Sequence, residues 1–113
     1  MDVINIDDFG KLDLRIATIL EAKEHPKADK LMILKVSLTN EERQIVASIR
    51  PYYKAEDLKG VQIVIVANLE PRTLRGETSH GMLLAVKDEN TSTGSVLSLL
   101  VPDKIVGSGL KVG

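Results

Sequence analysis

The chain has 113 residues, of which 43% are hydrophobic, and its 15 Lys and Arg stand against 16 Asp and Glu, for a net charge of -1. This length predicts one domain over residues 1–113, because such a chain buries about two thirds of its unfolded surface in one core. The near-neutral charge requires any nucleic-acid site to be a local basic patch. The absence of cysteine excludes disulfides, thiolate nucleophiles and Cys-based metal sites.

The ends and the interior of the chain carry no targeting or membrane signal that we can identify. The opening "MDVINIDDFGK" lacks a cationic start followed by a long apolar core, and no apolar run approaches the roughly 20 residues that span a membrane. No internal repeat or linker-like stretch divides the sequence. We therefore expect a cytoplasmic protein without membrane contact.

The N-terminal part predicts a short helical turn and then a bent strand. "IDDFGKL" predicts one turn with Asp7 or Asp8 as its cap and Gly10 at its end. In "LDLRIATILEA" apolar residues alternate from Leu12, and the parity then slips so that Ile19 continues the pattern. Such a slip predicts a β-bulge or a strong bend in the strand.

The middle of the chain predicts two more strands, a short helix and a buried strand. "LMILKVSL" at 31–38 and "RQIVASI" at 43–49 flank the turn "TNEE" and complete a three-stranded meander. "PYYKAEDLKG" predicts a short helix with Pro51 in its first turn and Gly60 after its end. The β-branched run "VQIVIVANL" at 61–69 predicts a central strand.

The C-terminal part adds "MLLAVK" and "SVLSLLV", two predicted strands around the loop "DENTSTG". Three strands, a short helix and further strands, with a bent first strand, is the element order of an OB-fold. We therefore predict an all-β, five-stranded OB-fold barrel with one short helix between strands three and four and a C-terminal extension. Such a barrel leaves few exposed edges and commonly binds oligonucleotides on one face.

Two predicted loops concentrate residues that suit contact with phosphate. "EHPKADKL" carries Lys27 and Lys30 beside a stiffening proline, and "NLEPRTLRGETSHGMLL" carries Arg72 and Arg75. Arginine offers a planar fork of donors that matches phosphate. The same residues also fit ordinary solvated turns, in which Gly76 serves only the chain reversal. The loops alone leave both interpretations open.

Three segments in combination resemble the tRNA-binding domain family: "DLRIATILEAKEHPKADKL", "IVASIRPYY" and "VIVANLEPRTLRGETSHGMLLA". That domain occurs at the C-terminus or as the separate β subunit of methionyl-tRNA synthetases. It also occurs as free-standing structure-specific tRNA-binding dimers and as an appendage of other synthetases. The resemblance covers nearly the whole chain.

The resemblance implies an OB barrel, usually a homodimer, that binds the outside of tRNA and recognises its shape and backbone. A catalytic methionyl-tRNA synthetase is a further partner that it implies. The acidic pairs at 41–42 and 56–57 are expected on the side turned away from RNA. The RNA-binding residues implied by the resemblance are Lys27, Lys30, Arg50, Asn68, Arg72, Arg75, Ser79 and Met82.

No pattern in the sequence predicts catalysis, a cofactor or a metal site. Ser79 and His80 are adjacent, and neighbours on a strand point to opposite faces, so they make a poor nucleophile and base. Neither His25 nor His80 lies in a metal-ligand spacing. Thr73 and Glu77 depart from the family pattern and make this loop less positive than in its relatives. We therefore expect a binding protein and not an enzyme.

An alternative within the same barrel family is a dimeric export-type chaperone that binds extended peptides. Such a protein needs an exposed apolar groove. In "SVLSLLVP" the five apolar residues between Val96 and Val101 cannot all face one barrel interior by alternation. They predict either a dimer interface or a peptide groove, and the family resemblance favours the interface.

Overall fold

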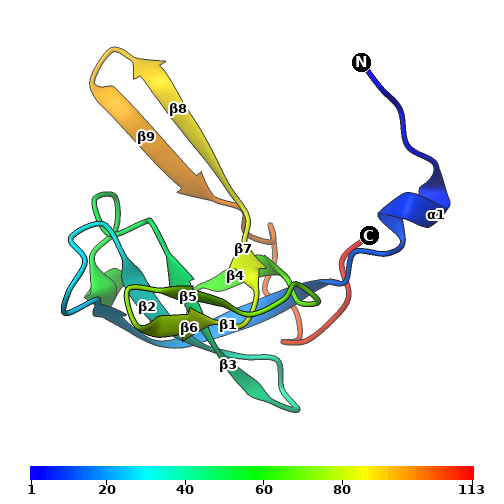
Figure 1. Ribbon diagram of the computed structural model, residues 1–113, viewed down its shortest axis with the longest axis horizontal. Coiled ribbons are helices and arrows are strands. Elements are labelled where there is room, and N and C mark those ends of the chain that lie inside the picture. Colours follow the sequence, from blue (N-terminus) through cyan, green and yellow to red (C-terminus); the bar gives the residue numbers. More distant parts are fainter.

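A five-stranded antiparallel sheet, curled on itself, forms the body of the molecule in a computed structural model that describes all residues 1–113 (Figure 1). The strand order across the sheet is β3-β2-β1-β4-β7. The strands are β1 (Leu14–Glu24), β2 (Met32–Ser37), β3 (Glu42–Ala47), β4 (Gln62–Val66) and β7 (Met82–Leu83). The curled half-barrel is consistent with the OB-fold predicted from the element order.

Two hairpins and two short helical turns complete the structure. The helical turns are α1 (Ile6–Phe9) and the 3-10 turn η1 (Ala55–Asp57). The hairpins are β5 (Arg72–Leu74) with β6 (Glu77–Ser79), and β8 (Ala85–Thr91) with β9 (Gly94–Leu99). No helix is long and apolar enough to cross a membrane.

The first strand bends so that it serves both halves of the sheet. Its first part, from Leu14 to Thr18, pairs with β4, and its second part pairs with β2. The register shifts between Ile19 and Glu21, which confirms the bulge expected from the slipped parity. The predicted alternation began too early, however, because Leu12 precedes β1 and is 41% exposed.

The interior of the curl holds the main core. Alternate side chains of β2, such as Leu34 and Val36, meet Ile45, Ile63 and Ile65 from the neighbouring strands. Burying each of these side chains contributes about 1.5–3 kcal/mol. A second, smaller cluster lies on the opposite face of β2 and β3. It consists of Leu31, Ile33 and Val46, with Ala28 and Leu74 packed against it.

Both helical predictions need correction. The cap of α1 is Asn5, whose Oδ1 accepts the N–H of Asp8 at 2.8 Å, whereas both aspartates lie inside the first turn. A cap side chain must precede the turn to reach its unpaired N–H groups. The second helix is only η1 and does not include Pro51, because the N–H groups of the two tyrosines that follow Pro51 both bond to Ile49 O and form a chain reversal.

The segment "DENTSTG" is also shorter as a loop than predicted. Its first four residues belong to β8, and Thr91 pairs with Gly94 across a two-residue turn. The β8–β9 hairpin projects from the body (Figure 1). It is held at its base by Tyr53, whose hydroxyl donates to Leu97 O at 3.4 Å and accepts from Leu99 N at 3.2 Å.

The C-terminal extension covers the edge of β1 that β2 leaves open. Backbone bonds join Ile16 N to Leu110 O (2.9 Å) and Gly109 N to Ile16 O (2.7 Å). Arg15 Nη1 donates to the carbonyl of Gly109 at 3.0 Å. The backbone of Gly109 has a φ of 85°, and a Cβ there would collide with Leu38 O. This close approach requires glycine.

We predict that Gly109→Ala destabilises the protein by more than the cost of a positive φ alone, which is about 1–2 kcal/mol. Thermal unfolding followed by circular dichroism measures the difference. Gly60→Ala is the matched control, because Gly60 has a φ of 88° but no atom within 4 Å of an added Cβ. Equal losses in the two variants would contradict the close packing of the C-terminal extension.

Candidate nucleic-acid interface

The loop of residues 25–31, hereafter the β1–β2 loop, presents two cations from a tight turn. The backbone closes through His25 N to Leu31 O (3.1 Å) and Leu31 N to Ala28 O (3.3 Å). Leu31 is buried in the small cluster, with Ala28 packed against it, which anchors the loop from beneath. The side chains of Lys27 and Lys30 are exposed.

The β5–β6 hairpin lies against the same small cluster. Leu74 packs onto it, and the strands pair with Arg72 opposite Ser79. The tip is a two-residue reversal in which Arg75 and Gly76 have φ values of 53° and 88°. Positive φ at both positions suits the twist of a tight hairpin. Arg72 and Arg75 are both exposed.

The hairpin tip touches the β1–β2 loop directly. Arg75 Nη2 donates to the carbonyl of Lys27 at 3.1 Å, across 48 residues of sequence. Three of the predicted cations, Lys27, Lys30 and Arg75, therefore border one shallow hollow, and Arg72 lies on the same hairpin. None of the ion pairs in the structure includes any of these four residues. Their positive charge is available to an external anion.

Two other predicted site residues are engaged inside the protein. Arg50 donates to Glu24 Oε2 (3.0 Å) and to the carbonyls of Ala28 (3.0 Å) and His25 (3.3 Å), so it supports the β1–β2 loop from within. Ser79 is buried; its hydroxyl accepts from Val46 N at 2.9 Å and donates to the carbonyl of Gly81 at 2.8 Å. The hydroxyl thereby links β3 to the residues that follow β6.

The last two predicted residues lie near the end of β4, away from the β1–β2 loop. Asn68 Oδ1 accepts the N–H of Asp13 (2.8 Å), and its Nδ2 donates to the carbonyl of Lys11 (2.7 Å). Met82 on β7 pairs with Val66 and is 50% exposed. Since Val66 pairs with the first residue of β1, this end of the face lies one strand length from the loop that follows β1. Asn68 and Met82 therefore lie apart from the strip of cations that the β1–β2 loop and the β5–β6 hairpin form.

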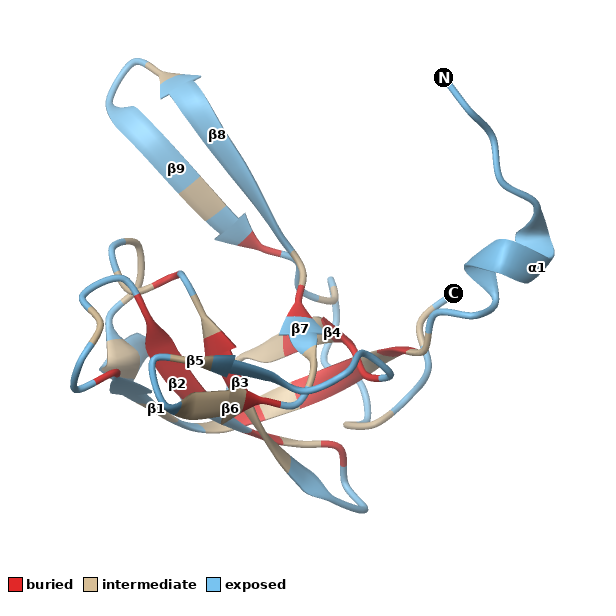
Figure 2. Cartoon of the chain, in the orientation of Figure 1, coloured by how far each residue is buried: buried red, intermediate tan, exposed pale blue.

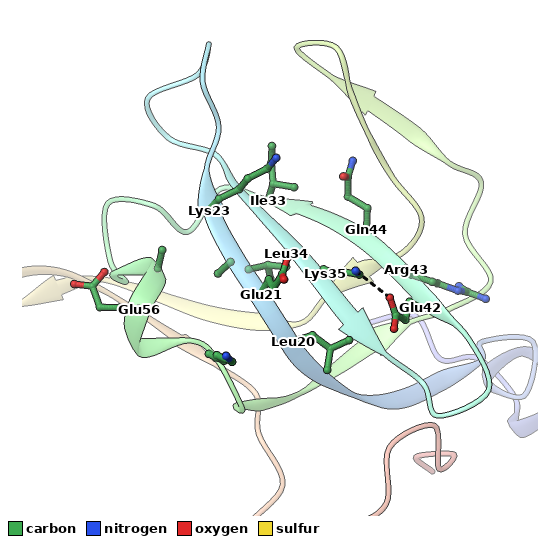
Figure 3. Close-up of a pocket in the computed structure, with 13 residues that line it drawn as sticks. Leu20, Glu21, Lys23, Ile33, Leu34, Lys35, Glu42, Arg43, Gln44 and Glu56 are labelled. Atoms are coloured by element: carbon green, nitrogen blue, oxygen red, sulfur yellow. Dashed lines mark ion pairs between the residues drawn. The ribbon is translucent and has the colours of Figure 1, made fainter.

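A separate groove of about 860 Å3, hereafter the sheet-face groove, lies on the outer face of β1, β2 and β3 (Figure 3). Its polar rim and apolar floor include Lys23, Lys35, Lys59, Glu21, Glu42, Glu56, Leu20 and Ile33. Lys35 and Glu42 form an ion pair at 3.3 Å (Figure 3). Arg43 also lines the groove and pairs with Glu41 at 3.0 Å, so the three lysines of the groove are offset by its three glutamates.

The sequence pattern indicates no role for these lysines or for His25. Charged residues at alternate strand positions are typical of any solvent-facing sheet surface, so their pattern gave no specific signal. His25 is only 2% exposed, although it sits in a polar loop. Nothing in the local sequence indicates that burial. No three His, Asp or Glu side chains gather where they could hold a metal ion.

Comparison with known proteins relates the chain to a family of tRNA-binding domains. The family described as "Putative tRNA binding domain" matches residues 14–111. Methionine–tRNA ligase of Pyrococcus horikoshii is 51% identical over 112 residues, which are 99% of this chain and 15% of the ligase. The ligase of Thermotoga maritima is 49% identical over 111 residues, 98% of this chain and 17% of that protein. The chain therefore spans less than a fifth of the length of these relatives.

Solved structures agree with this relationship. A MetRS related protein from Pyrococcus horikoshii superposes with a TM-score of 0.88 at 30% identity, over 100% of both chains. The chaperone CsaA from Bacillus anthracis superposes with a TM-score of 0.83 at 31% identity, over 99% of this chain and 100% of that one. The family match and the ligase relatives together show that this chain belongs to the tRNA-binding domain family.

Proposed function

We propose that the protein binds tRNA through the strip formed by the β1–β2 loop and the β5–β6 hairpin, without catalysis of its own. The observation that carries the proposal is the contact between Arg75 and the carbonyl of Lys27, which gathers cations of two loops on one face. These cations form no ion pair within the protein, so the phosphate oxygens of RNA would be their anionic partners. A net charge of -1 is no obstacle, because the patch is local.

Recognition proceeds through the shape and backbone of the RNA. Readers of single-stranded bases present aromatic platforms for stacking. This chain has one Phe, two Tyr and no Trp. The Tyr53 hydroxyl is bonded at the base of the β8–β9 hairpin, and Lys87 lies over the Tyr52 ring, with Nζ 5.8 Å from its centroid. Neither ring belongs to the strip.

The cellular task in this proposal is to raise the effective concentration of tRNA at a catalytic methionyl-tRNA synthetase in the cytoplasm. The high identity to part of the two ligases supports that assignment. A tethered tRNA-binding module increases the rate of productive encounter without adding a contact at the catalytic site. Arg50 and Ser79 serve this face by shaping it, whereas Lys27, Lys30, Arg72 and Arg75 make the contacts.

A homodimer is part of the proposal, and the β8–β9 hairpin supports it. Nearly all of the hairpin is exposed (Figure 2), although an isolated two-stranded hairpin is marginally stable in water. Val86, Val96, Leu100 and Val101, on the hairpin and directly after it, are between 44% and 58% exposed. A second copy that covers this surface would bury these side chains and provide two RNA-binding strips for one tRNA.

Binding of extended peptides is the second candidate function. The sheet-face groove favours it, because an apolar floor with balanced charges suits a peptide of mixed sequence better than a polyanion. The similarity to the chaperone CsaA points in the same direction. The two functions predict different ligands and different salt dependence.

Fluorescence anisotropy with tRNA, an unstructured RNA of equal length and an extended peptide, at several salt concentrations, tests the main proposal. We expect tRNA to bind most tightly and its affinity to fall steeply with salt, because phosphate contacts release counterions. Peptide binding without tRNA binding would overturn the proposal in favour of the second candidate.

Arg72→Ala and Arg75→Ala are each expected to weaken tRNA binding. Each should also reduce the steepness of log K against log salt by about 1, the amount that corresponds to one lost phosphate contact. The melting temperature should stay nearly unchanged, because neither side chain is in the core. Lys104→Ala is the matched control, since Lys104 is 85% exposed and pairs only with its neighbour Asp103. Unchanged affinity in both arginine variants would move the site elsewhere.

Substitution of Val86 and Val96 by aspartate is expected to shift a dimer to a monomer, because two carboxylates would have to be buried at the interface. Light scattering coupled to size-exclusion chromatography measures the mass. Ser92→Asp, in the turn of the same hairpin, is the control for added charge. A wild-type protein that stays monomeric at all concentrations would contradict this part of the proposal.

A further inference from the structure

The buried histidine of the β1–β2 loop bonds through both of its ring nitrogens. Nδ1 of His25 accepts the backbone N–H of Lys27 at 3.0 Å, and Nε2 lies 3.2 Å from the carbonyl oxygen of Leu74. A nitrogen that accepts an N–H bond carries no proton, so the proton of the neutral ring is on Nε2. Nε2 is therefore the donor to Leu74 O. The imidazole fits its site in this one tautomer.

The Nδ1 bond orders the β1–β2 loop itself, and the Nε2 bond joins that loop to an element distant in sequence. Lys27 belongs to the β1–β2 loop, and Leu74 is the last residue of β5, 49 positions after His25. The contact of Arg75 with the carbonyl of Lys27 is parallel to this link. The imidazole is buried, whereas Arg75 is exposed, so water competes with its hydrogen bond to the carbonyl of Lys27. His25 is thus the better shielded of the two connections.

The arrangement has to resist electrostatic repulsion. The hollow between the loop and the hairpin tip is lined by three cations, Lys27, Lys30 and Arg75, against the single carboxylate of Asp29, and no ion pair neutralises any of the three cations. Like charges at short range favour separation of the two loops. Neutral hydrogen bonds from a buried ring hold the loops together without cancelling the charge that RNA would use.

We propose that His25 is a positioning residue for RNA binding: its imidazole locks the β1–β2 loop to the β5–β6 hairpin and presents their cations as one preassembled surface. The inference rests on the proposed function for its consequence, but the lock itself can be measured without RNA. Preassembly matters because long cationic side chains and loops that are already ordered lose less entropy on binding.

Two substitutions at this position separate the two bonds. In His25→Asn the shorter side chain still accepts the N–H of Lys27, two residues later, as asparagine commonly does in turns. It does not reach the carbonyl of Leu74. His25→Ala removes both bonds. Gln62→Ala is the matched control, because the Gln62 amide holds the C-terminal extension through two bonds to Val106, beside Thr18 in the middle of β1 and away from the β1–β2 loop.

We expect both His25 variants to bind tRNA about tenfold more weakly and with a less steep dependence of log K on log salt. Gln62→Ala should bind tRNA like the wild type. Hydrogen exchange of the free proteins should become faster across residues 72–79 in both His25 variants. Exchange at the amide of Lys27 should become faster only in His25→Ala. If His25→Ala fails to fold, His25→Asn carries the test.

Wild-type affinity in a folded His25→Asn protein would overturn the proposal, because it would show that the shape of the loop alone is sufficient. Unchanged exchange across the β5–β6 hairpin in both variants would also overturn it. If the wild type binds no tRNA, the proposed function fails. The exchange data then decide separately whether His25 locks the two loops.

Discussion

The bend in β1 is the constraint on which the rest of the structure depends. One strand pairs first with β4 and then with β2, and the unpaired position between Ile19 and Glu21 allows the change of direction. A flat strand could not border both halves of a small barrel, because closure requires strong local twist. The bend also sets the place of the β1–β2 loop, which follows the far end of the strand.

The second face of β2 and β3 then positions the functional surface. Burial of Ile33 and Val46 against Leu74 fixes the β5–β6 hairpin beside the β1–β2 loop. A nearly neutral protein thereby gathers unpaired cations at one end of the barrel and leaves balanced charges in the sheet-face groove. This separation gives the tRNA and peptide hypotheses distinct surfaces on the same domain.

Two parts of the chain outside the main core, the C-terminal extension and the β8–β9 hairpin, are held in different ways. The C-terminal extension covers the edge of β1 through backbone hydrogen bonds. These bonds require its backbone to lie close to neighbouring strands, as at Gly109, and do not depend on buried apolar side chains. The β8–β9 hairpin instead projects from the body and is largely exposed (Figure 2). Its exposed residues include the apolar Val86 and Val96. Open strand edges and exposed apolar surfaces both favour aggregation in solution. The C-terminal extension covers the open edge of β1 within the chain, and the proposed dimer would cover the apolar surface of the hairpin.

The sequence by itself determined the order of the main elements along the chain, the bulge in β1 and the two segments that carry the cations, because alternation and turn chemistry are local properties. It did not reveal that the second segment, predicted as a loop, forms the β5–β6 hairpin. Only the tertiary structure decided that Arg50 and Ser79 face inward and that His25 is buried. Their partners are backbone atoms far along the chain, such as Val46 N, which lies 33 residues from Ser79. A residue pattern specifies which groups can donate or accept, but the fold decides which distant backbone atoms lie within reach.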